Sequence, residues 1–156
     1  MKDNTKKKLK LKVSAIKNGT VIDHIPATSL FKVLTILGLD RISSQITFGT
    51  NLDSAKLGQK GIIKVSDIYF EDEEINKIAL IAPHAKLNII KDYVVVEKKV
   101  VEIPEKIVDI VKCFNPQCIT NNEEITTCFQ VVSKDPIALK CHYCEKITSG
   151  EQIKIK

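Results

Sequence analysis

A chain of 156 residues with 44% hydrophobic content can form one medium domain or two small ones, and it contains no apolar run long enough to span a membrane. The net charge of +5 would suggest a nucleic-acid partner, but residues 1–12 carry all of it, as six lysines against one aspartate. The rest of the chain is neutral and lacks tryptophan, which argues against an extended basic surface with stacking rings.

The lysine-rich start is interpreted as a solvated, flexible basic tail over residues 1–8. Residues 9–16 alternate apolar and polar, which predicts a strand and not the continuous apolar stretch of a signal peptide. We therefore expect a soluble, cytoplasmic protein.

A turn is predicted at residues 17–19, and extended structure at residues 21–25 ends before a proline. The apolar period then changes to that of a helix, which Thr28 or Ser29 can cap and which stops at Gly38. The apolar positions expected on its buried side are Leu30, Phe31, Val33, Leu34 and Leu37.

Two further strands, residues 45–50 and 61–65, are expected on either side of a polar loop of residues 51–60. The carboxylates of residues 71–74 favour the start of a second helix that runs through Leu80, because the helix dipole stabilises negative charge there. Two more extended segments are expected at residues 86–91 and 93–101. Strand, helix, strand, strand, helix, strand is the ferredoxin-like order, an α+β fold in which an antiparallel sheet carries two helices on one face.

Four of the five cysteines form two close pairs, Cys113/Cys118 and Cys141/Cys144, separated by 22 residues. Two short loops that each supply two thiolates are typical of a tetrahedral zinc site. Four thiolates leave no open coordination position, so we expect one structural Zn²⁺ per chain and no metal-assisted catalysis. Two disulfides or inert buried thiols are the alternative interpretations.

The fifth cysteine, Cys128, lies in an alternating run and is interpreted as a small core side chain. His142 neighbours a predicted ligand and is expected at the surface, pointing away from the ion. Pro104 marks a boundary, and we expect one domain over residues 1–101 and a small zinc-bound β domain over residues 102–156.

Residues 19–27 (GTVIDHIPA) and 137–146 (IALKCHYCEK) together resemble the regulatory chain of aspartate carbamoyltransferase. The resemblance continues through Thr47–Gly49, Asn51–Leu52, Ile63–Lys64, Ala82–Pro83 and the four spaced cysteines. It implies a non-catalytic protein of two domains: an N-terminal allosteric domain that binds CTP, ATP and possibly UTP, and a C-terminal zinc domain that docks on the catalytic chain. Regulatory chains of this family pair into dimers that bridge catalytic trimers, so that nucleotides shift a tense/relaxed equilibrium in pyrimidine biosynthesis.

The resemblance also implies the residues of the nucleotide site. Lys60, Lys64 and Lys98 match phosphate-contacting lysines, while Asp23 and His24 match a ribose-contacting and phosphate-side pair. The base would be read by the main chain of Val13, Ala15 and Ile16, with the other side closed by Asn88, Ile90, Tyr93 and Val95. Ser14 stands where relatives carry an acid, which leaves the preference between CTP and ATP open.

Two other classes of function compete with this interpretation. A zinc-ribbon protein that binds nucleic acid would share the cysteine loops, but from residue 102 onward seven lysines oppose eight acids. An independent enzyme would need Asp23 and His24 to act together with a nucleophile, and no nucleophile motif surrounds them. Because successive residues of a regular strand face opposite sides of a sheet, we do not expect these two side chains to share one centre.

Overall fold

The computed structural model describes residues 15–156, and the chain divides into two compact units between Glu102 and Ile103. The predicted tail of residues 1–8 and most of the predicted strand at 9–16 lie outside the described residues. Among the described residues, no helix has the length and apolar character needed to cross a membrane.

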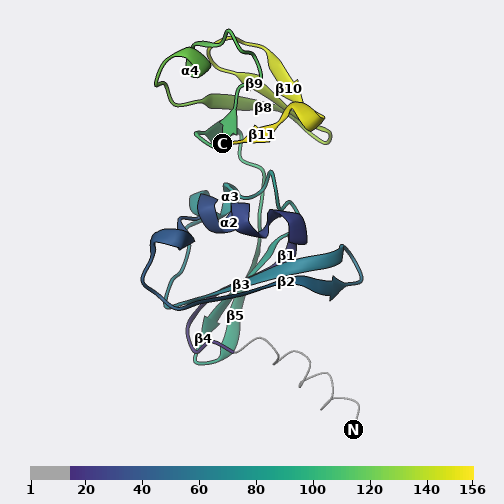
Figure 1. Cartoon of the computed structure of the whole chain (residues 1–156). Coiled ribbons are helices and arrows are strands. Elements are labelled where there is room, and N and C mark those ends of the chain that lie inside the picture. Colours follow the sequence, from purple (N-terminus) through teal and green to yellow (C-terminus); the bar gives the residue numbers. More distant parts are fainter. Residues whose placement is uncertain (1–14) are drawn as a thin grey trace. The chain divides into compact units, whose positions relative to one another are not determined.

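The N-terminal unit is an antiparallel sheet with helices on one face (Figure 1). Its strands follow the spatial order β2-β3-β1-β4-β5. The first four of these strands and the two α-helices form the ferredoxin-like arrangement expected from the sequence, and β5 adds a fifth strand at the edge beside β4. The elements are β1 (Gly19–Pro26), η1 (Ala27–Ser29), α2 (Leu30–Ile36), η2 (Leu39–Arg41), β2 (Ile46–Ser54), β3 (Gly58–Ser66), α3 (Asp72–Asn76), β4 (Lys86–Lys91) and β5 (Val94–Val100).

The core lies between the sheet and the helices. Ile22 of β1 pairs in register with Ile63 of β3 and with Leu87 of β4, and all three side chains are fully buried. Leu30 of α2 packs so closely over β3 that a Cβ built on Gly61 would lie 2.9 Å from its Cδ1. A side chain at position 61 would therefore require the Leu30 side chain to shift.

The first helix differs from its prediction in two respects. Gly38 adopts the left-handed conformation (φ 68°) that ends it, as expected. However, neither Thr28 nor Ser29 caps it, because a 3₁₀ turn leads directly into the helix and Ser29 makes no side-chain cap hydrogen bond. Phe31, predicted to be buried, is 63% exposed and meets the ring of Phe48 edge-on at 5.8 Å.

Two other predicted boundaries were wrong. The polar segment expected as a loop at residues 51–60 is mostly paired strand, since β2 continues to Ser54 and β3 begins at Gly58. The pairing register shifts between Gly49 and Leu52, and beyond this shift the hairpin extends past the core. Its polar side chains are exposed or half-buried on both faces of the hairpin. The α-helix of α3 ends at Asn76, and tight turns continue the chain to Ala82 in place of the predicted helix through Leu80.

The C-terminal unit is built from short strands, one α-helical turn and one 3₁₀ turn. A four-stranded sheet has the order β10-β9-β8-β6, and β7 pairs with β11. Phe129, Leu139 and Ile107 are its largest fully buried side chains. The elements are β6 (Lys106–Val108), β7 (Val111–Lys112), α4 (Ile119–Asn122), β8 (Cys128–Lys134), β9 (Ile137–Cys141), β10 (Ile147–Ser149), η3 (Gly150–Gln152) and β11 (Lys154–Ile155).

Candidate functional site

The four predicted metal-binding cysteines converge in the C-terminal unit. All four sulfur atoms lie within 4.8 Å of one another, and the Sγ atoms are 3.7 Å apart in Cys113 and Cys144 and 3.8 Å apart in Cys118 and Cys141. Tetrahedral coordination with Zn–S bonds of about 2.3 Å places sulfur atoms about 3.8 Å apart. These sulfur atoms are much farther apart than the roughly 2.0 Å of a disulfide bond, so they do not form disulfides. We call the four sulfur atoms of Cys113, Cys118, Cys141 and Cys144 the cage; their spacing fits tetrahedral coordination of an ion such as zinc.

The thiols of the cage differ in acidity. Burial raises the pKa of Cys113 to about 12. Burial also acts to raise the pKa of Cys144, but hydrogen bonds from the Lys146 backbone and the Asn115 side chain outweigh it and lower that pKa to about 7. A cation must therefore displace a proton from the buried Cys113 thiol, whereas Cys144, the least buried of the four, ionises more readily than Cys113.

Two asparagine side chains hold the Cys113–Cys118 loop. The Nδ2 group of Asn121 donates to the carbonyl oxygens of Cys113 (2.8 Å) and Asn115 (2.7 Å). The Nδ2 group of Asn122 donates to those of Pro116 (3.0 Å) and Cys118 (2.9 Å). These bonds fix the backbone that aims two of the four sulfur atoms.

The sequence interpretation missed these asparagines, although it predicted the ligands themselves. The available signal was the pair of adjacent asparagines shortly after Cys118, because asparagine side chains readily bond local backbone. Such partners of the ligand loops commonly change metal affinity by about 10- to 100-fold.

Asn121→Ala is expected to weaken metal binding by about 10-fold or more, because two carbonyl groups beside the ligands lose their donor. Competition with a chromophoric chelator measures this affinity. Gln117→Ala is the matched control, since Gln117 lies in the same loop with an exposed side chain. Equal affinities of the two variants would contradict the positioning role.

The other two candidate residues near the cage stay outside it. Cys128 is half-buried at the start of β8 and is not part of the group of four sulfur atoms. It is therefore less deeply buried than the core residue that was predicted. His142 is exposed, as expected, and its ring meets that of Tyr143 edge-on.

In the N-terminal unit, strand register collects several predicted site residues on the sheet face opposite the helices. Val21 pairs with Lys64 of β3 and with Asn88 of β4, and Asn88 pairs in turn with Lys98 of β5. Because side chains alternate between faces, these positions lie opposite the buried row of Ile22. We call this surface the lysine face; the predicted site residues with polar side chains on it are Asp23, His24, Lys60, Lys64, Asn88 and Lys98.

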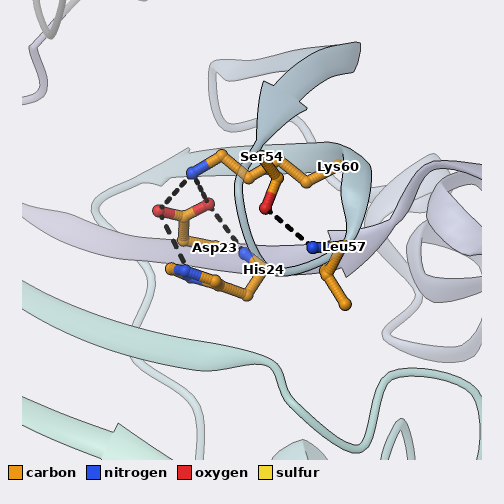
Figure 2. Close-up of polar contacts among 5 residues, drawn as sticks. All are labelled: Asp23, His24, Ser54, Leu57 and Lys60. Atoms are coloured by element: carbon orange, nitrogen blue, oxygen red, sulfur yellow. Dashed lines mark hydrogen bonds and ion pairs between the residues drawn. The ribbon is translucent and has the colours of Figure 1, made fainter.

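Asp23, His24 and Lys60 form one cluster on the lysine face (Figure 2). The Lys60 ammonium lies 2.8 Å from Asp23 Oδ1 and 3.1 Å from Oδ2. The His24 backbone N–H donates to Asp23 Oδ1 at 2.7 Å, and His24 Nδ1 lies 3.6 Å from Asp23 Oδ2. The expectation that Asp23 and His24 point apart was wrong, because β1 is irregular between Ile22 and Ile25 and His24 has a φ of 60°.

The electrostatics of the cluster favour an anion. Burial lowers the pKa of His24; Asp23 opposes this effect, and the ammonium groups of Lys60, Lys86 and Lys56 add to it. Burial also lowers the pKa of Lys64, which is 8% exposed, with Asp23 again acting in the opposite direction. Lys64 is therefore held in an environment that disfavours its charge, which is typical of a residue in a binding site.

The remaining predicted site residues that the structure describes lie near one end of the lysine face. The Tyr93 N–H donates to the Lys17 carbonyl at 2.9 Å, so the β4–β5 turn lies beside the segment that contains Ala15 and Ile16. Val95 pairs with Ile90 across these strands. Val13 and Ser14 lie outside the described residues.

The sequence matches two family descriptions that together span nearly the whole chain. Residues 11–102 match "Aspartate carbamoyltransferase regulatory chain, allosteric domain", and residues 105–154 match "Aspartate carbamoyltransferase regulatory chain, metal binding domain". The chain belongs to the aspartate carbamoyltransferase regulatory chain family.

Relatives named aspartate carbamoyltransferase regulatory chain come from distant organisms. The chain is 59% identical to that of Bacteroides fragilis over 145 residues, which covers 93% of this chain and 95% of the relative. It is 58% identical to that of Phocaeicola vulgatus, with 99% and 98% covered, and 54% identical to that of Pyrococcus horikoshii, with 92% and 95% covered.

Family membership settles the broad role of the two units. A regulatory chain is the non-catalytic subunit and has a catalytic chain as its partner, in an enzyme of pyrimidine biosynthesis. The thiol cage lies within the segment that matches the metal-binding domain, and the lysine face lies within the segment that matches the allosteric domain.

Proposed function

We propose that the lysine face binds nucleoside triphosphates, CTP and ATP with UTP as a further candidate, and that this binding shifts the tense/relaxed equilibrium of an aspartate carbamoyltransferase holoenzyme. The observation that carries the proposal is the collection of Lys60, Lys64 and Lys98 on one sheet face around Asp23 and His24. Phosphates suit ammonium groups on flexible stems, because reversible binding of more than one nucleotide needs charge without a rigid cage.

The predicted base-reading residues complete this proposal. In it, main-chain groups of Val13, Ala15 and Ile16 contact the base, and Asn88, Ile90, Tyr93 and Val95 close the slot. The support is the contact between Tyr93 and Lys17, together with the pairing of Val95 with Ile90. Main-chain donors and acceptors can pair with either a purine or a pyrimidine, which agrees with a site for both CTP and ATP.

We further propose that the ion in the cage is Zn²⁺, one per chain, and that it organises a surface that docks on the catalytic chain. Four thiolates favour soft metal ions, and Zn²⁺ is not redox-active, so it does not oxidise the thiolates that bind it. Each ligand loop also presents an exposed apolar side chain, Phe114 (41% exposed) in the first and Tyr143 (43%) in the second, and Ile119, which follows Cys118 in α4, is 42% exposed. Apolar groups fixed around a closed metal site are suited to a protein interface.

A homodimer of regulatory chains is the third part of the proposal. Val94, Val96 and Val100 are exposed on β5, which is an edge strand. An exposed apolar edge strand commonly pairs with another chain. Pairing would let each regulatory dimer bridge two catalytic trimers.

The test is reconstitution with a catalytic trimer, followed by aspartate saturation curves with and without CTP and ATP. A nucleotide acts at a distance only if it binds the two quaternary states with different affinity, and a coupling of about 1–3 kcal/mol is usual. We expect CTP to raise and ATP to lower the aspartate concentration at half saturation. If the catalytic trimer co-purifies but the aspartate saturation curves respond to neither nucleotide, the proposed partner is correct and the proposed allosteric regulation is wrong.

A further inference from the structure

Two lysines that are not among the predicted site residues lie near the Asp23 cluster. Lys86 of β4 is the cross-strand partner of Asp23, and directly paired residues have Cβ atoms about 5 Å apart. Lys56 lies in the three-residue turn between β2 and β3, four residues before Lys60. Both ammonium groups act on the His24 imidazole and lower its pKa.

The carboxylate of the cluster is already engaged. Asp23 is bound by Lys60 through both oxygens and by the His24 backbone. Within residues 15–156, neither Lys56 nor Lys86 forms an ion pair. The cluster therefore has more positive charge than Asp23 balances.

The position of Lys86 along β4 shows where this excess positive charge lies relative to the proposed base-binding end of the lysine face. Asn88 and Ile90, proposed to border the base, follow Lys86 on the same face of β4 by two and four residues. At about 3.3 Å per residue, Lys86 lies about 13 Å from Ile90 along β4. The surplus charge thus lies at the far end from the base, beyond the first phosphate of a bound nucleotide.

We propose that Lys86 and Lys56 form an outer phosphate subsite that makes the effector site select nucleoside triphosphates over monophosphates. The proposal rests on the proposed function and adds a determinant of phosphate number. Lys64 pairs with Val21 and Lys98 with Asn88, so both lie closer to the base end and contact the inner phosphate, whereas Lys86, paired with Asp23, and Lys56 contact the outer phosphates. Because neither Lys86 nor Lys56 forms an ion pair within residues 15–156, binding of an outer phosphate to either ammonium group breaks no existing salt bridge.

Titration calorimetry of the full-length chain with CTP, CDP and CMP tests the proposal. Lys86→Gln is expected to weaken CTP binding about 3- to 5-fold and Lys56→Gln somewhat less, in the range of partly exposed charge pairs, with CMP affinity unchanged. Lys86→Arg keeps the charge and should keep the preference for CTP. Lys32→Gln on α2 is the matched control, since it removes an exposed lysine from the helical side of the sheet.

The possible results distinguish a failure of the outer phosphate subsite from a failure of the whole proposed nucleotide site on the lysine face. A wild-type chain that binds none of the three nucleotides overturns both the proposed function and the subsite. Nucleotide binding with a CTP/CMP affinity ratio that Lys86→Gln and Lys56→Gln leave at the wild-type value overturns the subsite alone. A ratio that falls in both variants, while Lys86→Arg and Lys32→Gln retain it, establishes the subsite.

Discussion

Removal of the metal ion is expected to unfold the C-terminal unit and to leave the N-terminal sheet folded. The C-terminal unit has short strands and a small core, and its two ligand loops meet at the four sulfur atoms. Binding of a structural metal by four thiolates contributes on the order of 10 kcal/mol to such a unit. The N-terminal unit has its own core of Ile22, Ile63 and Leu87 and should not respond.

Amide hydrogen exchange before and after treatment with a chelator or a mercurial measures this difference for each strand. Protection should disappear from β8 and β9 and persist in β1 and β3. Cys118→Ser should reproduce the loss without a chelator, and Cys128→Ser is its matched control because Cys128 is outside the cage. Persistent protection of β8 and β9 in the metal-free chain would show that the core alone holds this unit.

Lys64→Met is expected to stabilise the chain while it weakens nucleotide binding. The lowered pKa of Lys64 means that the folded environment disfavours its charged form relative to the unfolded chain. While Lys64 is ionised in the folded chain, its side chain therefore reduces the free energy of unfolding, and this penalty fades as the pH rises through the lowered pKa. A charge-assisted hydrogen bond to phosphate is worth about 1.5–3 kcal/mol, so CTP affinity should fall about 10- to 100-fold.

Denaturant titration and calorimetry on the same preparation measure both effects. Lys99→Met is the matched control, because Lys99 on β5 pairs with Asp72 on the helical side of the sheet. That variant should lose a little stability and keep its affinity for CTP. A Lys64→Met chain that is less stable than the wild type would show that Lys64 serves the fold, and an unchanged affinity would remove Lys64 from the site.

The sequence was most informative where the determinants are local. Each cysteine pair lies within one short loop, so its spacing alone predicted the cage. Alternating apolar residues likewise predicted most strands, and Gly38 predicted the end of α2. Such features depend on neighbours along the chain and need no knowledge of the tertiary structure.

Register and irregularity could not be predicted in this way. The irregular segment of β1 that brings Asp23 and His24 together depends on pairing with β3, and a histidine at positive φ has no sequence signature. The same holds for Lys86, which gains its significance only because β4 places it opposite Asp23. The polar hairpin at residues 51–60 was mistaken for a loop because its strands bury little apolar surface.

The close approach of Leu30 to Gly61 has a mechanical consequence. Strand β3 carries Lys60 and Lys64 toward one side and Gly61 and Ile63 toward the other. Leu30 packs closely against β3 at Gly61, so strand and helix are in direct contact there. We expect that a displacement of β3 at Lys60 and Lys64 also displaces α2, because Leu30 of the helix contacts the strand. A change on the lysine face would then reach the helical side of the sheet without rearrangement of a loop.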